Sequence, residues 1–334
     1  MRTHSCPGHV PRKEPHTQGT TRAEPRSDRP QRARPRVKRE NRGLARTLGA
    51  VTPPEPEPDW AVRRPHPALR SLVTRYIGYR QHGVTLPVHR GLPSEHVTLI
   101  VSLLEPVRLI DMPGSAQRPD RWHGFASGLH AGPALVAQDP EQAGVHLEVN
   151  PLGVRTLLGV PAAELAGRVI DLADLPRPGL AELPERLRAA PSWASRFEIV
   201  DRTLLGSAAA SSGEQPPGEV GWAWHRLLGS GGGVAVRELA SDIGWSRRHF
   251  SERFAREVGL TPKQAARVVR FGRATALLRR LPPGGLAEVA HGCGYFDQAH
   301  MSNEFRALAG CSPRTWLREE LPFLQDVGVM GAQS

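Results

Sequence analysis

The sequence predicts a multidomain α+β protein, in which a strand-rich part comes first and an all-helical part follows. Between residues 60 and 206, segments that alternate apolar and polar residues precede segments with helical spacing. From residue 220 to residue 320, apolar residues recur at spacings of three and four, punctuated by Gly and Pro. Within that helical part, one short sequence pattern occurs twice, at an offset of 50 to 51 residues. A length of 334 residues leaves room for two domains of ordinary size.

Composition predicts five segments: a basic tail (1–59), a folded α+β domain (60–206), a linker (207–219), a helical domain (220–320) and a C-terminal tail (321–334). Residues 1–59 are rich in Arg and Pro and contain no Phe, Tyr or Trp, so they cannot bury enough apolar area to offset the entropy of ordering. We therefore expect this tail to be disordered. Its role stays open between a passive tail, a mis-set gene start and non-specific contact with DNA.

Three segments of the α+β domain have the pattern of β-strands. EHVTLIVSLL (95–104) and VRLIDM (107–112) are rich in apolar residues, and a Pro-containing turn separates them. In GVHLEV (144–149), apolar residues alternate with His146 and Glu148, as expected for a half-buried strand. Helices are predicted to follow at 151–159, at 161–167 with Pro161 at the start, and at 192–206 with Ser192 as the N-cap.

The charge of the chain favours a polyanionic partner. The formal net charge is +11 and the isoelectric point is about 10.7, which suits nucleic acid or an anionic membrane surface. Lys and Arg outnumber Asp and Glu by 13 to 7 in residues 1–59 and by 14 to 9 in residues 231–320, whereas residues 60–230 contain 17 against 16. The excess positive charge therefore lies toward the two ends of the chain.

Several classes of protein are disfavoured by what the sequence lacks. It contains no run of about 18 apolar residues, and its first 30 residues lack the apolar stretch of a signal peptide. Cys6, Cys293 and Cys311 are too few and too scattered for a disulfide framework or a clustered metal site. The sequence therefore predicts a cytoplasmic protein with no membrane partner, no metal and no cofactor.

The duplicated pattern extends over some 25 residues of each copy. Glu238-Leu239-Ala240 matches Glu288-Val289-Ala290, and Gly244-Trp245 matches Gly294-Tyr295, both at an offset of 50. From HFSERFAREVGLTP (249–262) to HMSNEFRALAGCSP (300–313) the offset is 51. Two copies of a helix-turn-helix would tolerate one extra residue in the turn, and two copies are too few for a helical solenoid.

Each copy predicts two helices and a buried stripe. In copy one, a short helix over about 236–242 ends near Gly244, Ser246 is the N-cap of a second helix, and Gly259 ends that helix. Apolar residues at helical spacing must face inward. They are Phe250, Phe254 and Val258 in copy one and Met301, Phe305 and Leu308 in copy two.

The outward face of each second helix has the chemistry of a DNA-reading surface. Arg, Gln, Asn and Ser side chains form hydrogen bonds with base edges in the major groove, and helix ends contact phosphates. The outward residues are Arg247, Arg248, Ser251, Glu252 and Ala255 in copy one, and Gln298, Ala299, Ser302, Asn303 and Arg306 in copy two, with His300 at the edge.

A helix between the copies sets their spacing. Thr261-Pro262-Lys263-Gln264 has the pattern of a capping box with Pro at the first helical position, and the predicted helix continues to about Arg280, before Pro282-Pro283. Some 18 residues at about 1.5 Å each span roughly 27 Å. This length approaches the distance of about 34 Å between successive major-groove faces. The sequence therefore predicts that one chain reads two such faces.

Residues 234–318 resemble the DNA-binding domain of the AraC/XylS family of bacterial transcription regulators. The duplicated pattern makes this a specific resemblance, although it covers only about a quarter of the chain. The residues that carry it are Leu239-Ala240, Ser246, His249-Phe250, Phe254, Gly259, Thr261-Pro262, Arg270, Ala274, Leu277-Leu278, Val289-Ala290, Gly294-Tyr295, Asp297, His300, Phe305-Arg306 and Gly310-Cys311-Ser312-Pro313.

The resemblance implies two helix-turn-helix units joined by a linker helix, with the second helix of each unit in the major groove. Glu252 can only accept hydrogen bonds and would repel phosphate, and Ala299 offers only a methyl group, so these two positions depart from the usual reading chemistry. By position, the base contacts fall on Arg248, Ser251, Glu252, Gln298, Ala299, His300, Ser302 and Asn303, and Arg247 and Arg306 complete the predicted DNA-binding set.

The resemblance also implies that residues 60–206 form an effector-sensing or dimerisation domain around a small, cupin-like β-barrel. The partners it implies are double-stranded promoter DNA, a small-molecule effector, a second copy of the chain in a homodimer and, for an activator, RNA polymerase. The expected function is therefore a sequence-specific transcription regulator controlled by a small molecule.

Other functions stay open at this point. One is an enzyme whose middle domain transforms a small molecule, and another is a DNA-binding architectural protein without a ligand. A protein-binding helical bundle fits less well, because the outward faces are basic and polar rather than aromatic. The chain shows no paired carboxylates, nucleophile triad or metal set, so we expect no catalytic residues and no enzymatic activity.

The remaining features have structural interpretations. The Gly-rich segment 229–233 lacks the Lys-Ser/Thr of a phosphate-binding loop and is expected to be a flexible joint. Trp222 and Trp224 are expected to pack a helix before copy one. Histidines without metal-ligand spacing are expected to be structural or to lie on the surface; they are His82, His89, His96, His123, His130 and His146.

Overall fold

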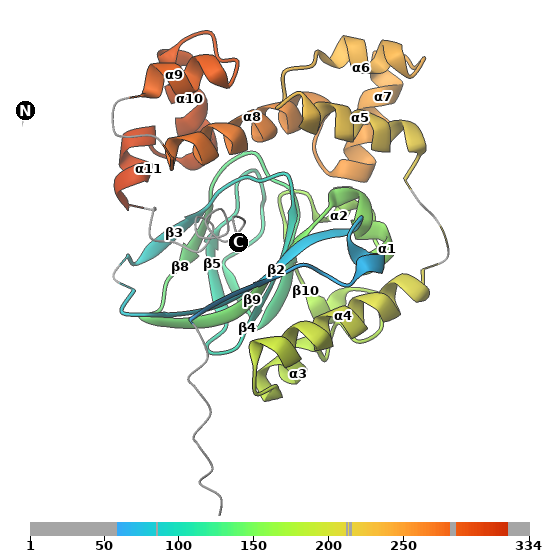
Figure 1. Ribbon diagram of the computed structural model, residues 1–334, viewed down its shortest axis with the longest axis vertical. Coiled ribbons are helices and arrows are strands. Elements are labelled where there is room, and N and C mark those ends of the chain that lie inside the picture. Colours follow the sequence, from blue (N-terminus) through green and yellow to red (C-terminus); the bar gives the residue numbers. More distant parts are fainter. Residues whose placement is uncertain (1–58, 85, 212, 214–215, 281–284, 320–334) are drawn as a thin grey trace, which may run out of the picture. The chain divides into compact units, whose positions relative to one another are not determined.

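The structure, a computed structural model, describes residues 59–84, 86–211, 213, 216–280 and 285–319. All of these residues lie in one compact unit. The predicted tail 1–59 apart from Asp59, the predicted tail 321–334, residue 320 and the Pro282-Pro283 helix stop lie outside the described residues. Figure 1 shows the order of the elements, with strands first and helices after, which confirms the predicted fold class.

In the part of the chain that the structure describes, the strands form a six-stranded and a four-stranded sheet, both antiparallel. In the larger sheet the order is β1 (Trp60–Arg63), β2 (Val73–His82), β9 (Glu141–Val149), β4 (Val97–Ser102), β7 (Gly124–Ser127) and β10 (Val169–Asp171). In the smaller sheet it is β3 (Val88–Gly91), β8 (Ala134–Ala137), β5 (Val107–Asp111) and β6 (Asp120–Trp122).

The helices of the α+β domain follow the last long strand. They are α1 (Val154–Leu158), α2 (Ala162–Leu165), α3 (Leu183–Ala189) and α4 (Trp193–Ala209). Short 3₁₀ turns occupy Pro67–Leu69, Pro151–Gly153 and Leu172–Asp174. The helical domain contains α5 (Gly218–Gly229), α6 (Val236–Asp242), α7 (Arg247–Val258), α8 (Pro262–Leu278), α9 (Leu286–Gly292), α10 (Gln298–Ala309) and α11 (Pro313–Glu319).

The predicted strands are present, and two that are consecutive in the chain belong to different sheets. The segments 95–104 and 107–112 contain β4 and β5, which belong to different sheets, so the Pro-containing turn passes between sheets instead of closing a hairpin. The segment 144–149 is the second half of β9, which pairs with both β2 and β4 at the centre of the larger sheet. Its alternation reflects one face packed on helices and the other facing the smaller sheet.

Helix α4 is fixed against the larger sheet by shape and by its cap. Ser192 is the N-cap, as predicted, and forms a reciprocal capping box with Ser195. Trp193 lies over β2 where Gly78 leaves room, since a Cβ there would come within 2.5 Å of the indole ring. The helix runs to Ala209, three residues past the predicted end of the domain, so the segment expected to be a linker begins as helix.

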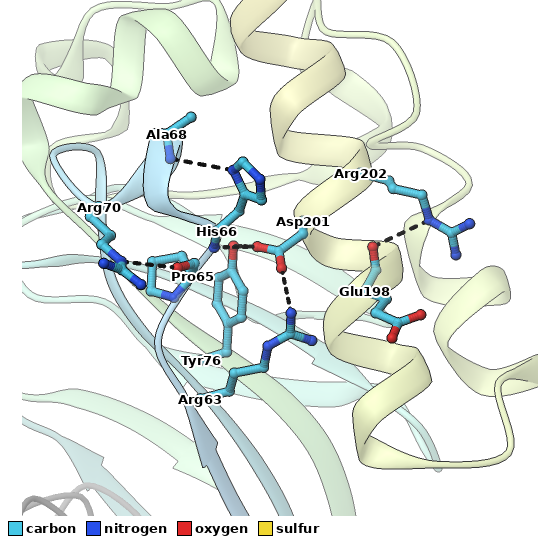
Figure 2. Close-up of polar contacts among 9 residues, drawn as sticks. All are labelled: Arg63, Pro65, His66, Ala68, Arg70, Tyr76, Glu198, Asp201 and Arg202. Carbon is cyan, nitrogen blue, oxygen red and sulfur yellow. Dashed lines mark hydrogen bonds and ion pairs between the residues drawn. The ribbon is translucent and has the colours of Figure 1, made fainter.

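A buried carboxylate ties the start of the domain to α4 (Figure 2). Asp201 is 6% exposed and accepts hydrogen bonds from the Tyr76 hydroxyl at 2.9 Å and the backbone N–H of His66 at 2.9 Å. Arg63 completes the cluster with an ion pair of 3.0 Å to the other carboxylate oxygen. Three donors thus compensate the burial of this charge, which would otherwise be costly.

The Gly-rich segment 229–233 is an ordered turn, which corrects the expectation of a flexible joint. Gly231 and Gly232 have φ of 60° and 76°, a region that favours glycine. A Cβ on Gly232 would lie 2.2 Å from the carbonyl oxygen of Ala266, so the turn packs directly on α8. The guanidinium of Arg270 donates to the Gly232 carbonyl at 3.2 Å and closes the contact. The glycines are present for close approach, not for mobility.

The tryptophans of α5 have different environments. Trp224 is 1% exposed and packs on Phe254 of α7 with 6.2 Å between ring centroids, as predicted. Trp222 is 43% exposed, so the expectation that it packs this helix in the same way as Trp224 is wrong. The two residues are only two positions apart, and a helix turns through about 200° over that distance, so they cannot share one buried face.

Candidate functional site

Helix α7 is built as the second helix of a helix-turn-helix. α6 ends at Asp242, and Gly244 makes the turn with φ of 71°. Ser246 then caps α7, its hydroxyl accepting from the N–H of His249 at 3.2 Å, and Gly259 ends the helix with φ of 92°. The predicted turn, cap and stop of copy one are therefore confirmed.

Helix α10 is built in the same way but with a different capping residue. Gly294 makes the turn with φ of 73°, and the carboxylate of Asp297 caps α10 by accepting from the N–H of His300 at 2.6 Å. Gly310 ends the helix with φ of 70°. The caps Ser246 and Asp297 are 51 residues apart whereas the turn glycines are 50 apart, so the extra residue of copy two lies between turn and cap.

The predicted buried stripes are confirmed and orient both helices. Phe250, Phe254 and Val258 are fully buried, and Met301, Phe305 and Leu308 are at most 1% exposed. Phe305 packs edge-on against Phe271 of α8 at 4.9 Å and near Trp316 of α11 at 5.7 Å. Because the stripes are fixed, the opposite faces of α7 and α10 must face outward.

The ten predicted DNA-binding residues all keep accessible surface. Ser251 and Ser302 are half-buried and the other eight are exposed; these are Arg247, Arg248, Glu252, Gln298, Ala299, His300, Asn303 and Arg306. The structure thus places them on the outward faces of α7 and α10, which α8 and α9 separate in the chain. Their contacts with bases and phosphates stay predictions.

Glu252, which departs from reading chemistry, has a partner on its own helix. Its carboxylate pairs with Arg248 one turn earlier at 2.9 Å, and both side chains are largely exposed, at 62% and 89%. An exposed i,i+4 pair contributes only about 0.3 to 0.5 kcal/mol. Breaking this pair, and so freeing the Arg248 guanidinium for another partner, therefore costs little.

The polar side chains of α10 are also pre-positioned. The Arg306 guanidinium donates to the side-chain oxygen Oδ1 of Asn303 at 3.0 Å, so the Asn303 amide N–H₂ is not used in this bond. Nδ1 of His300 accepts the N–H of Phe296 at 3.2 Å, and its ring meets Tyr295 edge-on at 5.4 Å. This hydrogen bond assigns the proton of a neutral His300 to Nε2, where it is a donor.

An ionic cluster that the sequence analysis did not identify fixes α10 on the linker helix. Glu304, on the inner side of α10, pairs with Arg267 at 2.7 Å and with Arg270 at 3.9 Å. The Arg270 guanidinium also lies 5.5 Å from the centre of the Tyr295 ring. Arg270 belongs to the residues that carry the family resemblance, but nothing in its spacing indicated an ion pair 34 residues away.

Figure 1 shows α8 between the two units, with α6 and α7 toward one end and α9 and α10 toward the other. The predicted capping box is confirmed, since Thr261 and Gln264 bond reciprocally at the start of α8. Its 17 residues span about 25 Å. The helix ends at Leu278, two residues before the predicted end, and remains close to the length that a one-turn spacing requires.

A second candidate site is a cavity of about 130 Å³ between the two sheets. Strands of both sheets contribute side chains, with Tyr79 and Gln81 from β2, Gln142 and His146 from β9, and Trp122 from β6. Three of the histidines expected to be structural, His89, His130 and His146, also line it. Sequence reasoning missed this site because its walls come from strands far apart in the chain.

Two polar atoms at this cavity have no hydrogen-bond partner within the described part of the chain. They are Oε1 of Gln81 and Nε2 of His146, and both are buried. The neighbouring amide of Gln142, by contrast, donates to Gln138 at 2.7 Å and to the Asp139 carbonyl at 3.2 Å. Buried polar groups are normally satisfied, so the two exceptions indicate places where a bound molecule would supply the partner.

Over the described residues, no group of three or more His, Cys, Asp or Glu side chains is arranged to hold a metal ion. No described helix combines the length and the apolar composition that crossing a bilayer requires. Cys293 is buried in the core of the second unit and Cys311 is half-buried, and neither forms a disulfide.

Comparison with known proteins places the helical domain. A family model described as a helix-turn-helix domain matches residues 239–319. No curated protein is significantly similar in sequence.

Among solved structures, ToxT from Vibrio cholerae is similar at 11% identity and a TM-score of 0.44, over 78% of this chain and 98% of that one. The DNA-binding domain of AdpA, solved with a target DNA, is similar at 29% identity and a TM-score of 0.27, over 33% of this chain and 96% of that one. The C-terminal domain of AraT, a response regulator from Geobacillus stearothermophilus, is similar at 23% identity and a TM-score of 0.29, over 31% of this chain and 88% of that one.

The matched span contains both copies of the motif, from Leu239 in α6 to Glu319 in α11. The match, the two capped and outward-facing helices and the helix that joins them agree with the resemblance stated from the sequence. Residues 239–319 accordingly form a helix-turn-helix domain.

Proposed function

We propose that the chain is a sequence-specific transcription regulator that reads two successive major-groove faces, one with α7 and one with α10. The observation that carries this proposal is the pair of equivalent helices whose outward residues differ. Ser302 and Asn303 stand where α7 has Ser251 and Glu252, so each helix presents a different set of donors and acceptors. Different sets favour different base sequences at the two faces.

The linker helix supports this geometry. The ion pairs of Glu304 with Arg267 and Arg270, together with the packing of Phe305 on Phe271, hold α10 on α8. On the other side, the Arg270 bond to the Gly232 carbonyl joins α8 to the turn before α6. Arg270 therefore contacts both units, and a rigid spacing between reading helices favours a site of fixed length.

We further propose that a small molecule in the cavity between the sheets controls this DNA binding. The support is a concave, mostly apolar space with a few polar side chains, which is the usual form of a small-molecule site. The unpartnered atoms of Gln81 and His146 mark where such a ligand would be oriented. Through this cavity, the α+β domain would act as the effector-sensing part of the regulator.

The remaining expectations belong to the same proposal. Promoter DNA is the partner, RNA polymerase is contacted if the protein is an activator, and a homodimer forms through the α+β domain. The protein acts in the bacterial cytoplasm, at the nucleoid. We propose no catalytic activity: the described residues at the cavity include no carboxylate and no cysteine, so neither a pair of carboxylates nor a thiol nucleophile is present there. Turnover of any compound from a metabolite panel by the purified protein would contradict this point.

Base reading is tested with Arg248→Ala and Asn303→Ala on the full chain. Each variant should bind a selected cognate site about tenfold or more weakly, while binding to random DNA changes much less, because a good base contact discriminates by about 1 to 3 kcal/mol. Arg202→Ala, which removes an exposed arginine from α4, is the charge-matched control and should leave both affinities unchanged. Equal losses on cognate and random DNA would mean that these residues contact only phosphates.

Small-molecule control is tested by measuring affinity for the cognate site with and without each compound of a panel that raises the melting temperature of the protein. A stabilising compound that also changes the DNA affinity at least several-fold supports the proposal. Compounds that stabilise the fold and leave the DNA affinity unchanged would contradict it, and would favour a DNA-binding protein without effector control.

A further inference from the structure

The cavity wall has no side chain that is permanently charged at neutral pH. Among the described residues that line it, none is Asp, Glu, Lys or Arg. Burial lowers the pKa of His146 to about 4 and also lowers the pKa of His130, so both rings are neutral at pH 7. A carboxylate or an ammonium group entering this space would lose its hydration and find no counter-charge, which is strongly unfavourable.

The volume limits the guest to a small molecule. The cavity measures about 130 Å³. An engineered apolar cavity of about 150 Å³ in another protein binds benzene, so a space of this size fits one aromatic ring. Apolar side chains supply most of the wall, including Ile100, Val107, Leu109 and Phe125. The same wall would leave a long, flexible or strongly polar molecule partly outside.

One buried acceptor gives the guest an orientation. Gln81 lies on β2, opposite Gln142 of β9. The Gln142 amide N–H₂ donates to Gln138 and to the Asp139 carbonyl, so Oε1 of Gln81 has no donor from this neighbour. A carbonyl oxygen can be satisfied only by a donor, and a hydroxyl or N–H group on the guest would supply it. A buried, unpaired acceptor destabilises the empty protein, and a guest that donates to it would remove that penalty.

We propose that the cavity binds an uncharged molecule of about one aromatic ring that carries a hydroxyl or N–H group, and that this group donates to Oε1 of Gln81. The inference rests on the proposed role of the cavity as the effector site and names the chemical class of the effector. It excludes carboxylic acids and amines that are ionised at pH 7.

The test measures binding of three probes of similar size, phenol, toluene and benzoate, to the full chain by calorimetry at pH 7. Phenol should bind most tightly, toluene several-fold more weakly because it lacks the donor, and benzoate not measurably. Benzoate binding as tightly as phenol, or no binding by phenol, would overturn the proposal.

The variant Gln81→Met removes the acceptor and keeps the side-chain length. It should reduce the preference for phenol over toluene to near unity, and it should not lower the melting temperature of the unliganded protein, because the buried carbonyl oxygen that it removes lacks a partner. Arg80→Met is the matched control, since Arg80 is exposed on the same strand and does not line the cavity. An unchanged preference in Gln81→Met would also overturn the proposal.

This experiment separates the ligand class from the control of DNA binding. If phenol binds as described and the DNA affinity does not respond, the class is right and the proposed control is wrong. If benzoate or another charged compound changes the DNA affinity while phenol does not bind, the control stands and the class is wrong.

A second inference concerns Phe296, the extra residue of copy two. In copy one the cap Ser246 follows Trp245 directly, whereas in copy two Phe296 stands between Tyr295 and the cap Asp297. Tyr295 is buried at 5% exposure, but Phe296 is 92% exposed, more than any other large hydrophobic side chain of the described residues. The fold holds its backbone through the bond from its N–H to His300 and makes almost no use of its ring.

The position of this ring gives it a use. The N-terminal residues of a helix that enters the major groove are those that reach base edges, and Phe296 immediately precedes the cap of α10. In that groove the one apolar feature that distinguishes a base is the 5-methyl group of thymine, which phenyl rings contact. We infer that Phe296 packs against a thymine methyl group at the face read by α10.

A double-mutant cycle tests this contact. Phe296→Ala should weaken binding to the selected site about fourfold, which corresponds to about 0.8 kcal/mol for one buried methyl-sized group. Replacing one particular dT of the site by dU, which removes only the methyl group, should weaken the wild-type protein by a similar factor and leave Phe296→Ala unaffected. Trp222→Ala, another exposed aromatic residue but on α5, should show no such coupling to any dT.

The outcome is decisive in either direction. If no dT→dU change is coupled to Phe296→Ala, the inferred contact does not exist. Should Asn303→Ala still lose specificity in that case, the proposed reading role of α10 stands without Phe296. If Asn303→Ala shows no specific loss either, the failure lies with the reading role itself.

Discussion

At the scale of single residues, Asp201 shows how one buried charge can join distant segments. It collects donors from Arg63, His66 and Tyr76, all more than 120 positions away in the chain. Burial and the neighbouring carboxylate of Asp201 raise the pKa of Tyr76 well above its usual value, so the hydroxyl stays a donor throughout the working pH range. The cluster therefore fixes the first strand and β2 against α4.

We expect Asp201→Ala to lower the free energy of unfolding by about 2 to 3 kcal/mol, because it leaves the Tyr76 hydroxyl buried without an acceptor. Tyr76→Phe should cost only about 1 kcal/mol, since Asp201 keeps its other donors. Urea unfolding of both variants measures the difference. The control is Glu198→Ala, an exposed carboxylate on the same helix, which should change stability by less than about 0.5 kcal/mol. A loss in Tyr76→Phe as large as in Asp201→Ala would contradict the assigned order.

His146 predicts a specific pH dependence of stability. Burial lowers the pKa of His146 to about 4 in the native protein, whereas the unfolded chain takes up the proton near the ordinary histidine pKa of 6.5. Between these two values the unfolded state binds more protons, so the free energy of unfolding falls as the pH is lowered from about 6.5 to about 4. The contribution is at most about 3 kcal/mol.

The variant His146→Gln removes this titration. It should lose less stability than the wild type between pH 6.5 and pH 4, as measured by denaturant unfolding at several pH values. Parallel curves for the two proteins over that range would show that His146 titrates normally, and would weaken the description of the cavity wall as uncharged.

At the scale of elements, the turn before α6 predicts that two glycines three positions apart respond very differently, in stability, to substitution by alanine. Gly232→Ala places a Cβ against the Ala266 carbonyl in a backbone region that favours glycine, and should cost about 2 kcal/mol or more. Gly229→Ala, three residues earlier, has open space around it in the last turn of α5 and should be neutral or stabilise by up to about 1 kcal/mol. Thermal unfolding of both variants checks the prediction, and similar midpoints would favour a flexible joint after all.

The helical domain was largely predictable from the sequence because its signals are local. Ser246 and Thr261 are caps within three residues of the N–H groups that they bind, and Gly244 and Gly259 make turns by themselves. The buried stripe of α7 follows from spacing alone. These signals occur twice in the chain, which fixes the relation between the copies without any knowledge of their contacts.

The α+β domain was less predictable because its strands are short and its contacts are distant. β6 contains three residues and β10 three, too few to show an alternating pattern. Gln81 and His146 reach the same cavity from strands 65 positions apart, and the pairing of β2 with β9 is what brings them there. The ion pair between Arg267 and Glu304 is similarly invisible until the two helices are packed.

At the scale of the whole molecule, the charge pattern and the structure fit one description. The α+β domain is nearly neutral and contains an uncharged cavity, whereas the helical domain carries the excess arginines and the outward polar faces. In the proposed function, arginines that meet phosphates would supply affinity that depends on salt, and the residues at the N-terminal ends of α7 and α10 would supply discrimination. Effector binding and DNA reading would thus have separate chemistry in separate parts of one chain.

The central claim is that α7 and α10 read two different sequences one DNA turn apart. Selection of DNA from a random pool by the purified full chain, repeated with Arg248→Ala and Asn303→Ala, tests it most directly. The account predicts two distinct motifs about 10 to 10.5 base pairs apart from centre to centre, one relaxed by each variant. A single motif, or two variants that relax the same positions, would contradict it.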